Sequence, residues 1–163
     1  MENKQTVTVI GAGLAGSEAA WQIAQAGYSV RLFEMKPQKF SPAHKSAGFA
    51  ELICSNSLKA ARINSAAGLL KEEMRRMDSL LVACADKTAV PAGGALAVDR
   101  DRFSELVTKA ITEHPNIEVM HGEVTEIPAE GVTVIASGPL TSDTLAEQIT
   151  NLCGGALSFF AAA

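Results

Sequence analysis

Three glycines near the start of the chain are spaced for phosphate binding. They belong to the segment Gly11-Ala12-Gly13-Leu14-Ala15-Gly16. In this pattern the first glycine permits a tight turn, the second lets the backbone approach a pyrophosphate, and the third lets a helix pack closely on a strand. The unpaired N–H groups and the positive dipole end of that helix then face the phosphates. We therefore expect all six residues of the segment to bind a dinucleotide.

One acidic residue completes this candidate site. Glu34 follows the apolar run Ser29–Phe33 and lies about 20 positions beyond the glycines, where a carboxylate accepts hydrogen bonds from a ribose diol. The alternative is a solvated acid at the end of a strand. The spacing favours the ribose-binding role.

The elements around these residues supply the context that the motif requires. The β-branched run Thr6–Ile10 predicts a strand, Leu14–Ala26 predicts a helix that ends at Gly27, and residues 29–33 predict a second strand. A strand, a glycine turn, a helix and a strand in this order distinguish a dinucleotide site from an incidental glycine-rich turn.

The rest of the chain continues to alternate between strands and helices. Residues 35–58 contain no clear long element, although 49–54 could form a short helix or strand. One helix is expected over 66–85, where Leu69, Leu70, Met74, Met77 and Leu81 form an apolar stripe. The remaining predicted elements are a strand at 96–98, a helix at 100–113 capped by Asp99, strands at 117–120, 123–127 and 132–136, and a helix from Thr141 or Ser142 to 152.

This order predicts the fold class. Buried strands with little polar alternation are typical of parallel sheets that are covered on both faces. We expect an α/β, Rossmann-like dinucleotide-binding domain with a parallel sheet and helices on both faces. The apolar segment 157–163 resembles the start of a further element, so residues 1–163 are expected to be a partial domain, incomplete at the C-terminus.

Composition limits the setting and the partners. The 163 residues carry a net charge of −4, which argues against gross attraction to nucleic acid or an anionic membrane but not against a local basic patch. No apolar stretch approaches the length of a membrane span, and no signal-peptide pattern is present. The three cysteines, Cys54, Cys84 and Cys153, form no C-x-x-C pair. We expect a cytoplasmic protein with no membrane partner and no metal site.

Several separate segments resemble those of one family. They are VTVIGAGLAGSEAAWQIAQAG, VRLFEMKP, SPAH, FAELICSNSLK, AAGLLKEEMRRMDSL, VPAGGALAVDRDRFS and VTVIASGPLTSDTLAE. From Val7 to about Gly155 the chain is similar to the N-terminal portion of the TrmFO (Gid) family of folate- and FAD-dependent tRNA uracil-5-methyltransferases. The glycine motif is widely shared, whereas the segments around Cys54 and over 90–100 are much less common and carry the resemblance.

The resemblance implies a function. It implies that the protein binds FAD, takes reducing equivalents from NAD(P)H, and transfers a one-carbon unit from methylenetetrahydrofolate to C5 of a T-loop uridine in tRNA. Segment 11–16 would hold the FAD pyrophosphate, Glu34 the adenosine ribose, and Cys54 would act in methyl transfer near the flavin. Arg100 lies in a stretch associated with flavin binding, and Gly138 in a small-residue turn that lets the backbone approach the dinucleotide. Because family members are considerably longer, this chain is expected to bind FAD at most.

Several residues keep a plainer alternative. Without the resemblance, Cys54 is more typical of a small buried residue, and a reactive thiolate would need a helix beginning at Ser55–Ser57 or the nearby Lys59. His44 is either a surface residue or a neighbour of the flavin. Eight basic residues could form a phosphate-binding face or a solvated surface: Lys36, Lys39, Lys45, Lys59, Arg62, Lys71, Arg75 and Arg76.

Two functional alternatives also remain. One is a tRNA-modifying flavoprotein of the GidA (MnmG) type, against which the segment Ile53–Ser57 argues. The other is a nucleotide-binding fragment without activity.

Overall fold

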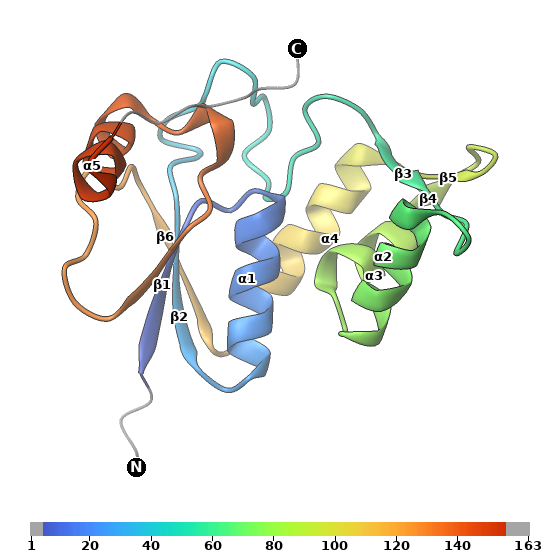
Figure 1. Ribbon diagram of the computed structural model, residues 1–163, viewed down its shortest axis with the longest axis horizontal. Coiled ribbons are helices and arrows are strands. Elements are labelled where there is room, and N and C mark those ends of the chain that lie inside the picture. The colour runs from blue at the N-terminus through green and yellow to red at the C-terminus, as the bar shows by residue number, and fades with distance from the viewer. Residues whose placement is uncertain (1–4, 156–163) are drawn as a thin grey trace.

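The molecule has two parts, and a four-stranded parallel sheet forms one of them (Figure 1). The computed structural model describes residues 5–155. The strand order is β6-β2-β1-β7, with β1 (Thr6–Ile10) between β2 (Ser29–Glu34) and β7 (Val132–Ile135), and β6 (Ile117–His121) outside β2. All pairings are parallel, so the carboxyl ends of the four strands meet at one edge. In a sheet of this kind that edge is where ligands bind.

Helices cover both faces of this sheet. α1 (Leu14–Gln25) packs its small side chains Ala20 and Ala24 against the strands, while α5 (Asp143–Cys153) lies on the other side of the strands in Figure 1. A short 3-10 turn, η1 (Gly138–Leu140), leads from β7 toward α5. The Trp21 ring of α1 and the His114 ring pack in a T-shaped arrangement, with centroids 5.2 Å apart. The fold class predicted from the sequence is confirmed.

A second group of elements, residues 57–98, is called the hairpin region below. It holds a small antiparallel sheet in the order β3-β5-β4, made of β3 (Ser57–Ala60), β5 (Ala95–Val98) and β4 (Ala89–Val90). Two helices, α2 (Ala66–Arg76) and α3 (Leu80–Lys87), lie between β3 and β4 in the chain. α4 (Arg100–Thr112) returns the chain to β6, and Asp99 caps it as predicted by accepting a hydrogen bond from the Arg102 N–H.

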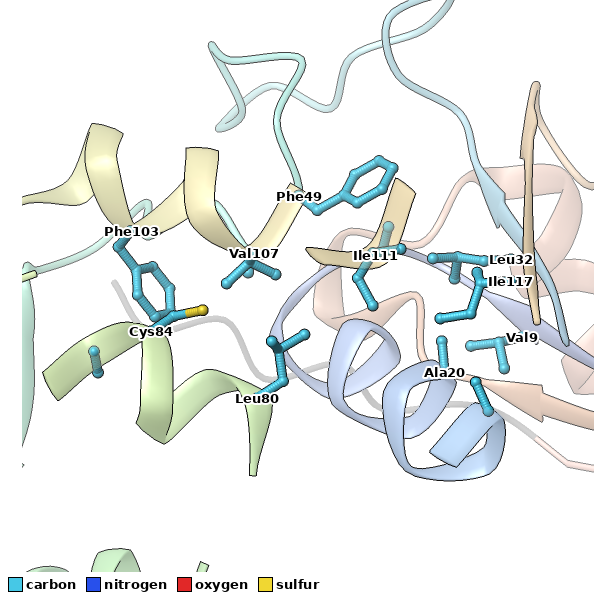
Figure 2. Close-up of a cluster of buried hydrophobic side chains, with 14 of the residues drawn as sticks. Val9, Ala20, Leu32, Phe49, Leu80, Cys84, Phe103, Val107, Ile111 and Ile117 are labelled. Carbon is cyan, nitrogen blue, oxygen red and sulfur yellow. The ribbon is translucent and has the colours of Figure 1, made fainter. Parts of the chain in front are cut away.

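One hydrophobic core joins the two parts along α4. Figure 2 shows Phe103 and Val107 on the side of α4 near Leu80 and Cys84 of α3. Farther along the same helix, Ile111 lies near the side chains of the sheet and of α1. The parallel sheet, α1, α3, β5 and α4 therefore share one buried interior.

The single helix predicted over 66–85 is wrong, because the structure has two. Asp78 takes a left-handed conformation with φ of +54°, which a continuous helix does not allow. Ser79 then starts α3 by accepting a hydrogen bond from the Val82 N–H at 3.2 Å. The predicted apolar stripe is also largely unburied, since Leu70 is 56% exposed and Met77 is 70% exposed.

Two other predicted elements are absent within the described residues. Segment 49–54 forms neither helix nor strand, because the Phe49 backbone bonds to side chains of α4 and the Ala50 N–H to the Ala12 carbonyl oxygen instead of to a neighbouring strand. Segment 123–127 is not a strand either. β6 ends at His121, Gly122 turns the chain with φ of +140°, and Glu123 binds the Lys39 side chain. Within residues 5–155, no helix has the length and apolar character needed to cross a membrane.

Candidate functional site

The geometry of the loop between β1 and α1 gives a reason for each glycine. Gly11 has φ of +99°, and a side chain there would lie 2.8 Å from the Ala136 carbonyl oxygen. A Cβ at Gly16 would lie 1.7 Å from the Gly11 carbonyl oxygen, so only glycine lets α1 start this close to the turn. By contrast, a Cβ at Gly13 would meet nothing within 4 Å. Gly13 therefore leaves open space where a ligand can reach the backbone.

The first turn of α1 is free to bind an anion. No side chain caps this helix and no acidic residue lies in its first turn. The helices α2, α3 and α4 begin differently, with caps from Ser65, Ser79 and Asp99, whereas α5 also lacks a side-chain cap but carries the acidic Asp143 in its first turn. Uncapped N–H groups at a helix N-terminus, together with the helix dipole, favour a phosphate.

Glu34 is fixed beside this loop. Its side chain is buried, and its Oε2 accepts a hydrogen bond from the Ala12 N–H at 2.8 Å while its Oε1 accepts one from the Lys36 N–H at 3.0 Å. An ionised carboxylate can accept about four hydrogen bonds, so two acceptor positions remain. Glu34 can therefore orient the loop and accept hydroxyl groups of a ribose at the same time.

A cavity of about 280 Å³ opens beside these groups. It lies at the carboxyl ends of β1, β2 and β7, as expected for a ligand site in a parallel sheet. Gly138, with φ of +70°, belongs to its wall. The residues of the cavity wall that bear on ligand binding are Gly11, Gly13, Leu14, Ala15, Glu34, His44, Ile53, Glu123 and Gly138.

Cys54 lies next to this cavity in the chain but is not among the residues that line it. Its side chain is exposed, whereas the preceding Ile53 lines the cavity. The helix suggested as a source of thiolate character at Ser55–Ser57 is wrong, because β3 begins at Ser57. His44 does line the cavity, and its Nδ1 is 2.6 Å from the Ser41 hydroxyl oxygen.

Arg100 lies outside the cavity wall. Its Nη1 donates a hydrogen bond to the Leu52 carbonyl oxygen at 3.3 Å, and it borders a second groove between α4 and segment 45–52. Arg100 therefore holds the segment that leads to Ile53, through its hydrogen bond to Leu52.

Five of the eight basic residues are engaged within the protein. Lys39 pairs with Glu123 and Arg75 with Asp86, each at 2.7 Å. Burial, together with the nearby charge of Arg75, lowers the pKa of Lys71. The others are Arg76, which pairs with Glu72, and Lys36, which donates to the Gly48 carbonyl oxygen. The basic residues thus serve mainly internal contacts.

Sequence reasoning missed the support that surrounds the cavity. Lys36 and Glu51 line it, and the Ala50 N–H donates to the Ala12 carbonyl oxygen at 2.9 Å. The available signal was the position of Lys36, two residues after Glu34 at the end of a buried strand. A charge at such a position is rarely buried without partners.

Comparison with known proteins identifies relatives along nearly the whole chain. The family model described as "Glucose inhibited division protein A" matches residues 6–161. A methylenetetrahydrofolate–tRNA-(uracil-5-)-methyltransferase TrmFO of Lactobacillus johnsonii is 61% identical over 160 residues, which are 98% of this chain and 36% of that protein. The protein of the same name from Geobacter sulfurreducens is 62% identical over 94% of this chain and 36% of its own length. The chain thus spans about a third of these relatives.

Solved structures agree on the fold. Aquifex aeolicus GidA in its form I crystal superposes with a TM-score of 0.65 at 19% identity, covering 84% of this chain and 26% of that one. The Tyr258Phe mutant of NikD, an amino acid oxidase, gives a TM-score of 0.53 at 17% identity, covering 88% and 54%. At these identities the likeness establishes the fold alone.

Proposed function

The chain belongs to the Glucose inhibited division protein A family, and from that premise we propose that it is the FAD-binding part of a methylenetetrahydrofolate-dependent tRNA uracil-5-methyltransferase. The observation that carries the binding half is the uncapped N-terminus of α1 facing one cavity with Glu34. The chain is about 60% identical to TrmFO proteins but 19% identical to the GidA structure from Aquifex aeolicus. This difference supports the TrmFO activity over that of the GidA type.

FAD fits the groups that are present. The open space at Gly13 and the free N–H groups of α1 suit its pyrophosphate, and the two remaining acceptor positions of Glu34 suit a ribose. Apolar side chains such as Ile10, Phe33 and Ile53 line the same cavity and suit an aromatic ring system. When bound, FAD supplies the redox and one-carbon chemistry of the reaction.

The residues of this chain bind and orient. Segment 11–16 holds the pyrophosphate, Glu34 accepts the ribose hydroxyls, and Gly138 lets the backbone approach the dinucleotide. Cys54 offers an exposed thiol directly after Ile53, which lines the cavity, and we assign it the covalent part of methyl transfer. Arg100 acts on the cofactor only through segment 45–52, because its hydrogen bond goes to the Leu52 carbonyl oxygen.

The remaining partners belong to the whole enzyme. We propose NAD(P)H as the reductant, methylenetetrahydrofolate as the one-carbon donor and a T-loop uridine of tRNA as the acceptor, all in the cytoplasm. The support is the name shared by relatives of which this chain spans about a third.

The test separates cofactor binding from methyl transfer. The purified chain is expected to take up FAD, seen as a visible absorption band that stays with the protein on gel filtration. A chimera in which residues 1–160 replace the matching part of the Lactobacillus johnsonii protein should form 5-methyluridine in a tRNA transcript. In that chimera Cys54→Ala should abolish turnover and keep FAD, whereas Cys153→Ala is the matched control and should remain active.

Each result bears on one half of the proposal. A chain that takes up no FAD removes the binding half. A chimera that holds FAD and forms no 5-methyluridine removes the methyltransferase half, and full turnover by the Cys54→Ala chimera removes that residue from the chemistry.

A further inference from the structure

The irregular segment Gly48–Glu51 is bonded to α4 through Phe49. The Phe49 N–H donates to Thr108 Oγ1 at 2.8 Å, and the Phe49 carbonyl oxygen accepts a hydrogen bond from the Ser104 hydroxyl at 2.6 Å. The Phe49 ring is fully buried in the common core (Figure 2). Phe49 therefore anchors this irregular segment to α4 and to the core.

Lys36 holds the same segment from the end of β2. Its side chain is only 4% exposed, and its ammonium donates to the Gly48 carbonyl oxygen at 2.6 Å and lies 3.8 Å from Glu51 Oε2. The Glu51 carboxylate in turn accepts hydrogen bonds from the backbone N–H groups of Lys45 and Ser46. A buried ammonium is retained only when its charge and donors are satisfied. The Lys36 side chain is thus committed to this segment.

The conformation of Ala50 shows that the segment is constrained. Ala50 has φ of +50° and is completely buried, although a residue with a Cβ pays roughly 1 kcal/mol or more for this conformation. Its N–H donates to the Ala12 carbonyl oxygen at 2.9 Å, and the Ala12 N–H is the one that binds Glu34. The segment is therefore aligned on the glycine loop itself.

The chain that leaves this segment reaches the cavity. Ile53 lines the cavity with its side chain 42% exposed, and Cys54 follows it. We propose that Lys36 is a positioning residue, which through Gly48–Glu51 fixes Ile53 against the bound dinucleotide and Cys54 beside it. The inference rests on the proposed function, because it takes the occupant of the cavity to be FAD.

A second buried lysine provides a matched control for a purely structural role. The Lys71 ammonium donates to the carbonyl oxygens of Ala60 and Ala67, at 3.1 and 3.0 Å, and its side chain is likewise buried. It belongs to α2 in the hairpin region and does not line the cavity. Both Lys36→Met and Lys71→Met therefore remove an ammonium that donates to part-buried carbonyl oxygens, but only the first acts on the segment before Ile53.

The experiment measures FAD affinity by titration and the alkylation of each cysteine by iodoacetamide, read by peptide mass spectrometry. Cys153 is exposed and serves as an internal reference, and Cys84 is buried and reports unfolding. In the parent chain, FAD should slow alkylation of Cys54 relative to Cys153. We expect Lys36→Met to weaken FAD binding about tenfold and to remove this protection, since it removes the charged donor of the hydrogen bond to the Gly48 carbonyl oxygen. Lys71→Met should keep both properties.

The outcomes distinguish this inference from the proposed function. If the parent chain binds no FAD, the proposed function fails. The inference is then tested by alkylation alone. In that test only Lys36→Met should change the ratio of the Cys54 to the Cys153 alkylation rate. If Lys36→Met behaves like Lys71→Met in every measurement, the inference is overturned. Should Lys36→Met expose Cys84, Thr108→Val replaces it, because that variant removes one of the two hydrogen bonds between Phe49 and α4 without removing a buried charge, and its agreement with the parent would equally overturn the inference.

Discussion

One helix in the parallel-sheet part and one in the hairpin region begin in closely similar ways but serve different purposes. Gly16 is the third residue of α1, and Gly68 is the third residue of α2. A Cβ at either position would collide with a carbonyl oxygen of the preceding turn, that of Gly11 at 1.7 Å or of Arg62 at 1.8 Å. Ser65 caps α2, whereas no side chain caps α1. Close packing therefore needs the glycine in both places, while of these two helices α1 alone leaves its N–H groups for a ligand.

Adding a methyl group at each of these glycines tests whether the two helix N-termini are equally important for stability. Gly16→Ala and Gly68→Ala should each lower the free energy of unfolding by about 3 kcal/mol, because the added methyl group overpacks a backbone contact. Urea denaturation measures the loss. Below the unfolding transition, only Gly16→Ala should also reduce FAD uptake. Equal loss of FAD by folded Gly68→Ala would show that the two parts do not act separately.

A smaller effect on stability is expected where the sheet part has open space. Gly13→Val places a side chain where nothing lies within 4 Å, so the free energy of unfolding should change by no more than about 1 kcal/mol. FAD uptake should nevertheless be lost, because the side chain occupies the approach to the helix N-terminus. Urea denaturation and FAD titration of the same sample provide the check. Normal uptake by this variant would place the pyrophosphate elsewhere.

The smallest effect concerns pH. The hydrogen bond from Lys39, aided by Ser142, lowers the pKa of Glu123 below its ordinary value of 4.5. A lowered pKa in the folded state stabilises the protein fully above pH 4.5, and this contribution is lost as the pH falls through the lowered value. Lys39→Met should therefore make stability fall less steeply below pH 4.5, measured as melting temperature against pH. An unchanged profile would mean that the pair does not hold the loops beside the cavity.

Local pattern predicted the sheet part well, and the reason is physical. The strand Thr6–Ile10, the glycine turn, the helix from Leu14 and the strand up to Glu34 each depend on neighbours within a few residues. The proximity of Glu34 to the glycine loop also follows from parallel pairing, since β1 and β2 end side by side.

The hairpin region and segment 48–54 depend on partners that no local pattern reveals. The break at Asp78 requires one left-handed residue inside an otherwise helical pattern, and the exposed side of α2 shows that periodicity does not identify what covers a face. Segment 48–54 has its place because Ser104 and Thr108, more than 50 residues later, bond to its backbone. For the same reason the position of Cys54, one residue after the cavity-lining Ile53, could be expected only from resemblance.

Trp21, which packs on His114, provides an intrinsic fluorescence signal. Trp21 is the single tryptophan of the chain and lies seven residues into α1, about 10 Å along the helix axis from Leu14. Indole emission overlaps flavin absorption, so a flavin bound at the start of α1 would quench this fluorescence by energy transfer. One intrinsic signal would then follow both the integrity of the helix and the occupancy of the site at its end.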